Sequence, residues 1–179
     1  MQQGTVKQHN YEKVIALLGG LTGAATVSLL HEALKLTVPS VAPRMDLLDM
    51  EAMKKIRERV HLSIPPEREL YKQTIISELI AYTLYYSLAG GNAADLKGTT
   101  LGILAGIGAV ELPEKLNLNR EHSKRTKATE YLTMGIYIAG GLMAAATIGS
   151  MTQLTHKVSK IKAPKIKAPD IKKLVRKLK

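Results

Sequence analysis

Apolar residues are gathered in four blocks along the chain, and charged segments separate them. A bilayer is crossed by roughly 20 mostly apolar residues, with a range of about 17 to 25. The fourth block has 25 residues without a charge, and the first has 17 before His31 and Glu32. The pattern therefore predicts membrane-spanning helices at residues 14–36, 70–94, 97–112 and 130–155.

The third block is short for a full crossing, because only the 13 residues from Gly98 to Val110 are consecutively free of charge. A short buried or re-entrant helix is an alternative for it. The expected fold class is all-α. It is an integral membrane bundle of about four transmembrane helices, the third marginal, between a polar N-terminal segment (1–13) and a basic C-terminal tail (157–179).

Between the first two blocks lies a polar insertion, residues 37–69, which predicts an amphipathic helix. Asp46 follows Pro43 and is expected to cap this helix, and Pro65 and Pro66 are expected to end it. Its apolar side is expected to contain Leu47, Met50, Met53, Ile56 and Val60. The helix is expected to lie either on the membrane surface or against the end of the bundle.

The segment "GTTLGILAGIGAV" is rich in glycine, which suggests either a phosphate-binding loop or a helix contact. A dinucleotide-binding loop needs G-x-G-x-x-G after a strand, and a P-loop needs a Lys-Ser/Thr pair; neither is present. Spacing by four instead places small residues on one helix face, which lets helices approach closely in lipid. The glycines expected at such contacts are Gly19, Gly23, Gly98, Gly102, Gly106, Gly135, Gly140 and Gly141.

Candidate chemistry is sparse. The chain has no cysteine, which excludes disulfides and thiolate ligands. The metalloprotease pattern H-E-x-x-H fails after His31, because Lys35 stands where the second histidine is needed. Glu58 and His61 form a single E-x-x-H, whereas a di-iron bundle needs two. We therefore expect no catalytic residue, no metal site and no cofactor.

Glu78 interrupts the second apolar block. Carboxylates inside a membrane are costly and often functional, so Glu78 is the candidate ion or proton site. It is only seven residues past Tyr71, a residue type that favours the headgroup level. A structural role at the membrane interface is the favoured alternative.

The net charge of +11 is concentrated in the tail, which contains nine Lys and one Arg, and Asp170 as its single acidic residue. A repeated "IKAP" favours an extended spacer. A short amphipathic helix is expected after it, with Lys172, Lys173, Arg176 and Lys177 beside an apolar stripe. An anionic lipid surface would use both the charges and the stripe, whereas nucleic acid would use only the charges. Anionic headgroups are therefore the expected partner, and nucleic acid is the alternative.

Two segments, "HEALKLTVPSVAPRMDLL" and "LGILAGIGAVELPEKLNLN", resemble a type of small bacterial multi-span membrane protein. The resemblance covers about residues 14–150 and leaves the tail outside. It implies a multi-pass protein of the bacterial inner membrane and implies no activity.

The sequence thus predicts a non-enzymatic integral membrane protein that acts as an anchor, scaffold or accessory subunit. One alternative is a small channel or transporter that uses Glu78 and assembles as a homo-oligomer. Another alternative is a soluble helical protein whose basic tail binds nucleic acid, which the near-zero mean hydropathy of −0.02 leaves open.

Overall fold

The computed structural model describes the backbone of residues 2–160 and the side chains of residues 10–158. All regular secondary structure in this part of the chain is helical, which confirms the all-α class. The helices are α1 (Gln2–Thr37), α2 (Met45–Arg59), α3 (Glu67–Ser87), α4 (Ala94–Lys115), α5 (Glu121–Lys124) and α6 (Lys127–Lys160).

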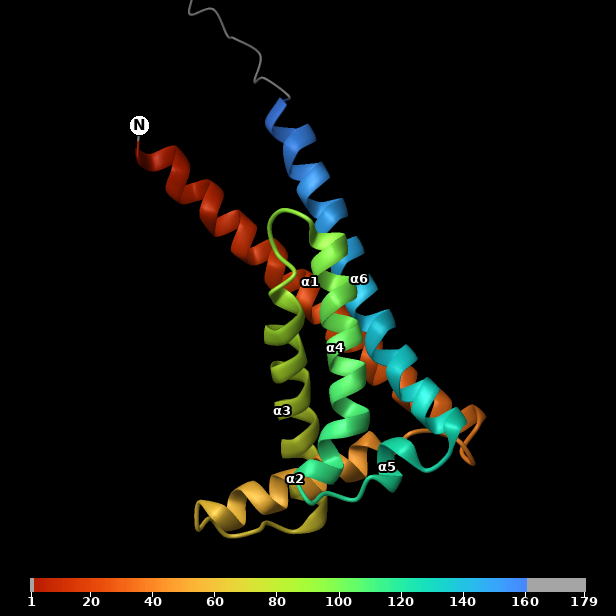
Figure 1. Ribbon diagram of the computed structural model, residues 1–179. Coiled ribbons are helices and arrows are strands. Elements are labelled where there is room, and N and C mark those ends of the chain that lie inside the picture. Colours follow the sequence, from red (N-terminus) through yellow and green to blue (C-terminus); the bar gives the residue numbers. More distant parts are fainter. Residues whose placement is uncertain (1, 161–179) are drawn as a thin grey trace, which may run out of the picture.

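Four long helices, α1, α3, α4 and α6, run alternately up and down (Figure 1). The start of α1, the connection between α3 and α4 and the end of α6 therefore lie at one end of the molecule. The two shorter helices, α2 and α5, lie together across the opposite end. We call this the capped end.

Two of the long helices are long and apolar enough to cross a membrane. They are α1, within Asn10–Thr37, and α6, within Lys127–Val158. Among the described residues, α3 and α4 do not meet the same criterion of length and composition. The structure thus supports two candidate spans, whereas the apolar blocks predict four.

Two helices differ in length from the predicted spans. One is longer because no helix breaker interrupts it, and the other is shorter because a turn ends it. The predicted polar segment 1–13 belongs to α1 from Gln2 onward, because no proline interrupts residues 2–37. Conversely, α3 stops at Ser87 instead of residue 94. Gly91 follows with a φ of 82°, a conformation that favours glycine, and the chain turns there into α4.

The central helix is α6, which packs against α4 on one side and α1 on the other. On the α4 side, glycines allow backbone to meet backbone. A Cβ added at Gly98 would lie 2.5 Å from the carbonyl oxygen of Gly141, and one at Gly102 would lie 2.8 Å from Tyr137 O. Gly106 similarly faces the backbone of Met134 at 3.0 Å. Any larger residue would push α4 away from α6.

The contact between α1 and α6 is built in the same way. A Cβ added at Gly19 would lie 2.9 Å from Ala144 O, and one at Gly23 would lie 2.8 Å from Gly140 O. Next to these glycines, the Thr22 hydroxyl donates a hydrogen bond to the Thr147 hydroxyl at 2.9 Å. Two segments with similar glycine spacing, in α1 and α4, therefore both pack on α6.

Gly135 does not take part in a helix contact, contrary to the prediction. No atom lies within 4 Å of a Cβ added there, so its face of α6 is open. Spacing by four defines a face of a helix, but it does not say which face meets a neighbour.

The amphipathic helix of the insertion is present as α2, but its predicted cap and apolar side are partly wrong. Asp46 does not cap α2; its carboxylate accepts hydrogen bonds from Arg44 and Lys35. The buried apolar residues of α2 are Met45, Leu48 and Met50. The predicted apolar residues Ile56 and Val60 are 59% and 55% exposed.

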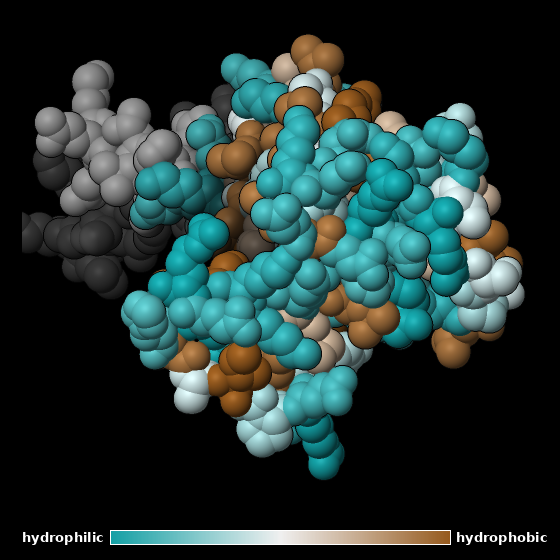
Figure 2. Space-filling view, turned by 60° about the horizontal axis from the view of Figure 1, so that its bottom comes forward, coloured by the Kyte–Doolittle hydropathy of each residue, from teal (hydrophilic) through white to brown (hydrophobic). Residues whose placement is uncertain are grey.

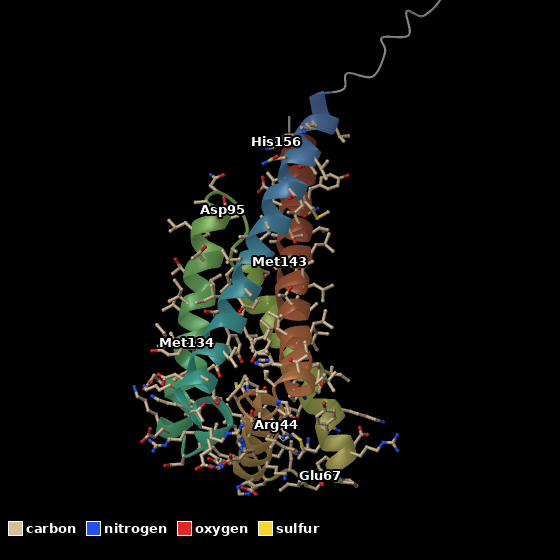
Figure 3. All side chains as sticks on the ribbon, turned by 90° about the vertical axis from the view of Figure 1, so that its right-hand side faces the viewer. Arg44, Glu67, Asp95, Met134, Met143 and His156 are labelled. Carbon is tan, nitrogen blue, oxygen red and sulfur yellow. The ribbon has the colours of Figure 1, made fainter. Side chains whose placement is uncertain are left out.

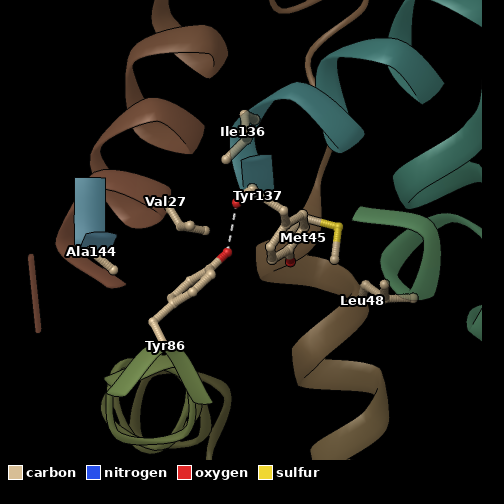
Figure 4. Packing of buried hydrophobic residues seen from close by; sticks show 7 residues of the cluster. All are labelled: Val27, Met45, Leu48, Tyr86, Ile136, Tyr137 and Ala144. Atoms are coloured by element: carbon tan, nitrogen blue, oxygen red, sulfur yellow. Dashed lines mark hydrogen bonds between the residues drawn. The ribbon is translucent and has the colours of Figure 1, made fainter. Parts of the chain in front are cut away.

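The first half of α2 packs against the end of the bundle, so the bundle-end alternative holds for this half of the helix. Met45 and Leu48 join a core cluster with Tyr86 and Tyr137 (Figure 4). The insertion therefore closes one end of the apolar core.

Substitution of Gly141 tests the backbone contact between α4 and α6. In Gly141→Ala the new methyl group would overlap the carbonyl oxygen of Gly98. We expect a loss of stability of about 1–3 kcal/mol, measured by thermal unfolding of the purified protein in detergent. Gly135→Ala is the matched control on the same helix. It should be stabilising by up to about 1 kcal/mol, because alanine is the better helix former. Equal melting temperatures for the two variants would contradict the contact.

Candidate functional site

Two tyrosines from different helices meet in the middle of the bundle. The hydroxyls of Tyr82 (α3) and Tyr137 (α6) lie 2.6 Å apart, and their rings meet edge to face. Tyr86, one turn further along α3, donates from its hydroxyl to Tyr137 O at 2.8 Å (Figure 4). Buried tyrosines usually bond their hydroxyls in this way, so these contacts fix α3 against α6.

His31, on α1, packs against the same tyrosine. Its ring lies 5.8 Å from that of Tyr137 in an edge-to-face arrangement, and only 6% of the residue is exposed. The Nε2 atom of His31 has no hydrogen-bond partner within the described part of the chain. Since buried polar atoms are nearly always bonded, this unpaired nitrogen needs an explanation.

A network of four charged side chains surrounds the start of α2. Lys35 lies 2.5 Å from Glu32 and 3.4 Å from Asp46, and Arg44 lies 3.2 Å from the same aspartate. Burial raises the pKa of Asp46, but the hydrogen bonds from Arg44 and the charge of Lys35 outweigh it, and the pKa falls below its usual value. The two cations and two anions therefore neutralise one another.

Asp49, one turn along α2, is in a different position. Its Oδ2 atom is buried and unpaired among the described residues. Burial, and then the negative charge of Asp46, raise the pKa of Asp49 to about 7. This carboxyl is therefore poised between its neutral and charged forms near neutral pH.

Glu78, the ion or proton site predicted from the sequence, lies on the inner side of α3. It is half-buried, and among side chains 10–158 no hydrogen bond or ion pair to its carboxyl is formed. It lines a cavity of about 450 Å³ together with His31, Lys35, Asp46 and Tyr71. A second hollow of about 510 Å³, between α3 and α4, is lined by Asp49, Tyr82 and Tyr137.

The structure therefore brings Glu78 into a group of polar residues that the sequence analysis did not single out as a site. Spacing carries part of the signal, since Glu78 and Tyr82 are four residues apart and share a face of α3. That His31, Asp49 and Tyr137 approach the same region depends on how the helices cross.

The other candidates are not part of this group. Glu58 and His61 are both exposed on the capped end. Within the described residues, no three His, Cys, Asp or Glu side chains are grouped to hold a metal ion. The predicted lipid-surface residues of the tail, Lys172, Lys173, Arg176 and Lys177, lie outside the described residues.

No protein-family model, curated protein or solved structure matches this chain. Its function is therefore inferred from the side chains and surfaces described above.

Asp49 should make the stability of the protein depend on pH. Its pKa is about 7 in the folded chain and about 4 in an unfolded one. The folded form thus holds the proton more tightly, and stability falls as pH rises from about 4 to 7 and then levels off. Asp49→Asn cannot ionise. It should therefore be more stable than the wild type at pH 8, by about 2–4 kcal/mol, with little difference at pH 4.

Thermal unfolding across this pH range, in one detergent, measures the effect. Glu58→Gln, an exposed substitution on the same helix, serves as the control and should follow the wild-type profile. Parallel pH profiles for the wild type and Asp49→Asn would show that Asp49 is not the group responsible.

Proposed function

We propose that this chain is a non-enzymatic integral membrane protein with four crossings, which serves as an anchor, scaffold or accessory subunit. The observation that carries the proposal is the exposure of large aliphatic side chains on all four long helices. They include Val14, Leu17, Leu21, Leu29, Ile76, Ile80, Leu84, Leu104, Ile107, Leu142 and Met143, each 43–69% exposed. Apolar surface this extensive on a soluble monomer would be unusual, whereas lipid covers it.

The distribution of charge along the bundle supports the same proposal. Arg44 and Glu67 lie near the capped end and Asp95 and His156 near the other, with Met143 between them along α6 (Figure 3). A bilayer accepts this arrangement because its apolar interior is flanked by polar headgroup regions. In the proposal, α3 and α4 cross the membrane in the company of α1 and α6, which shield part of their surface.

The capped end is the surface that a scaffold or accessory subunit would offer to a partner. Figure 2 shows hydrophilic side chains over much of this end, with hydrophobic ones gathered at its margins. Ion pairs hold its loops in place, among them Lys124 with Glu111 at 2.6 Å and Arg120 with Glu114 at 3.2 Å. Such exposed pairs contribute little stability, but they order the polar surface.

The proposal places the protein in the bacterial inner membrane, with its basic tail against anionic headgroups. The end of α6 lies on the same side as the start of α1. Because α6 continues to Lys160, the segment that leaves it there is 161–179, and this segment of net +7 would meet the headgroups of one leaflet. Each lysine or arginine near such a surface contributes about 1 kcal/mol of attraction.

Labelling of introduced cysteines tests the number of crossings, and the chain has no cysteine of its own. Four crossings place Asn92, between α3 and α4, and Glu58, near the end of α2, on opposite sides. We expect an impermeant maleimide to label Asn92→Cys and Glu58→Cys in membrane vesicles of opposite orientation. Ala146→Cys, exposed in the middle of α6, should be labelled in neither.

The alternatives give different labelling patterns. If only α1 and α6 cross, Asn92→Cys and Glu58→Cys lie on the same side and are labelled in the same vesicles. If the protein is soluble, all three cysteines react in a membrane-free extract. Either pattern would overturn the four-crossing proposal.

A further inference from the structure

The cavity of about 450 Å³ between α1, the start of α2 and α3 has an unusual set of walls. Its lining includes apolar residues such as Met45, Ile75 and Ile76. It also includes His31 and Glu78, neither of which has a side-chain hydrogen bond or ion pair among the described residues. Unpaired polar groups that share a cavity with apolar walls are typical of a ligand site.

The charge balance around the cavity decides which ligand suits it. Lys35 and Arg44 are occupied by Glu32 and Asp46, as described above, so this network is neutral. Glu78 is then the one acidic group lining the cavity that lacks a cation partner among the described side chains. The site favours a cationic group and disfavours an anion in its interior.

The cavity has too few metal-ligating side chains for a metal ion to be its best ligand. Metal ions need several oxygen or nitrogen ligands, and no group of three acidic or histidine side chains is present within the described residues. A primary ammonium group instead presents three N–H donors. The Glu78 carboxylate accepts one, and a neutral His31, which also lines the cavity, offers a ring nitrogen as a second acceptor.

The mouth of the cavity suggests where the ammonium comes from. Lys72 lines the cavity and is exposed, so it can pair with a phosphate there. Ile76 also lines the cavity and is 59% exposed, and Ile80 and Leu84 continue this apolar track along α3. A lipid with an ethanolamine headgroup has an ammonium, a phosphate and acyl chains in this order.

We propose that this cavity binds the ethanolamine headgroup of a membrane phospholipid, with the ammonium held by Glu78 and His31 and the phosphate by Lys72. The choice of a lipid as the source rests on the proposed membrane location. The lipid would stabilise the side of the bundle where α1 and α3 meet α2.

Short-chain phospholipids test the site without a bilayer. Full-length protein in detergent is titrated with dihexanoyl phosphatidylethanolamine or dihexanoyl phosphatidylcholine, and the midpoint of unfolding is followed. Phosphatidylcholine has the same phosphate, but its trimethylated nitrogen has no N–H donor. We expect the ethanolamine lipid to bind the wild type about tenfold more tightly or better, as hydrogen bonds to charged groups allow.

Three variants of cavity residues and one control variant assign this preference to the cavity. Glu78→Gln should lose most of the preference, whereas Glu67→Gln, exposed at the start of α3 and outside the cavity, should keep it. Lys72→Ala should weaken the binding of both lipids by a similar factor, because both contain the same phosphate group. His31→Gln should reduce the preference only in part, which keeps the test informative if Glu78→Gln unfolds.

Equal binding of the two lipids by the wild type would overturn the proposal, as would a preference unchanged in both Glu78→Gln and His31→Gln. Free ethanolamine provides a further arm. If it binds as tightly as the short-chain lipid, the source is a soluble amine and the lipid assignment is wrong. Because all measurements are made in detergent, their outcome is independent of the number of membrane crossings.

Discussion

The close approach of α6 to both α1 and α4 is the constraint on which the rest of the structure depends. At Gly98 and Gly141 the two backbones meet with no side chain between them, and Gly23 and Gly140 do the same on the α1 side. In water, each glycine inside a helix costs about 0.8–1 kcal/mol relative to alanine. In lipid, where the backbone has no water to bond, the helix persists and the close packing is gained.

The same contacts create the polar interior, because α6 holds α1 and α4 tightly while α3 packs on α1 and touches α4 little. The space left beside α3 is filled by larger side chains, among them Tyr82 and Tyr137. It also leaves two hollows, which are lined by Glu78 and Asp49. A tightly packed axis and a polar site near one end are thus two results of one arrangement of helices.

The parts of this structure that follow from local pattern could be predicted, and the parts set by helix crossing could not. Spacing by four placed Gly98 and its neighbours on one face, but the same rule failed at Gly135, whose face is open. Asp46 was expected to cap α2 because of its position in the sequence. In the fold, however, its carboxylate forms ion pairs with Lys35 and Arg44. Glu78 stood out within an apolar block, whereas the burial of His31 beside Tyr137 depends on three-dimensional packing.

The most direct test of the central helix is a disulfide between α1 and α6 in the full-length protein as it is produced in cells. The hydroxyls of Thr22 and Thr147 lie 2.9 Å apart, so cysteines at these positions should be close enough to bond. In the otherwise cysteine-free chain, Thr22→Cys/Thr147→Cys should form an intramolecular cross-link under mild oxidation, seen as a shift in gel mobility that reduction reverses. Neither single variant should show this shift. Two cysteines that react with maleimide but form no cross-link, or that link only separate chains, would contradict the packing of α1 on α6.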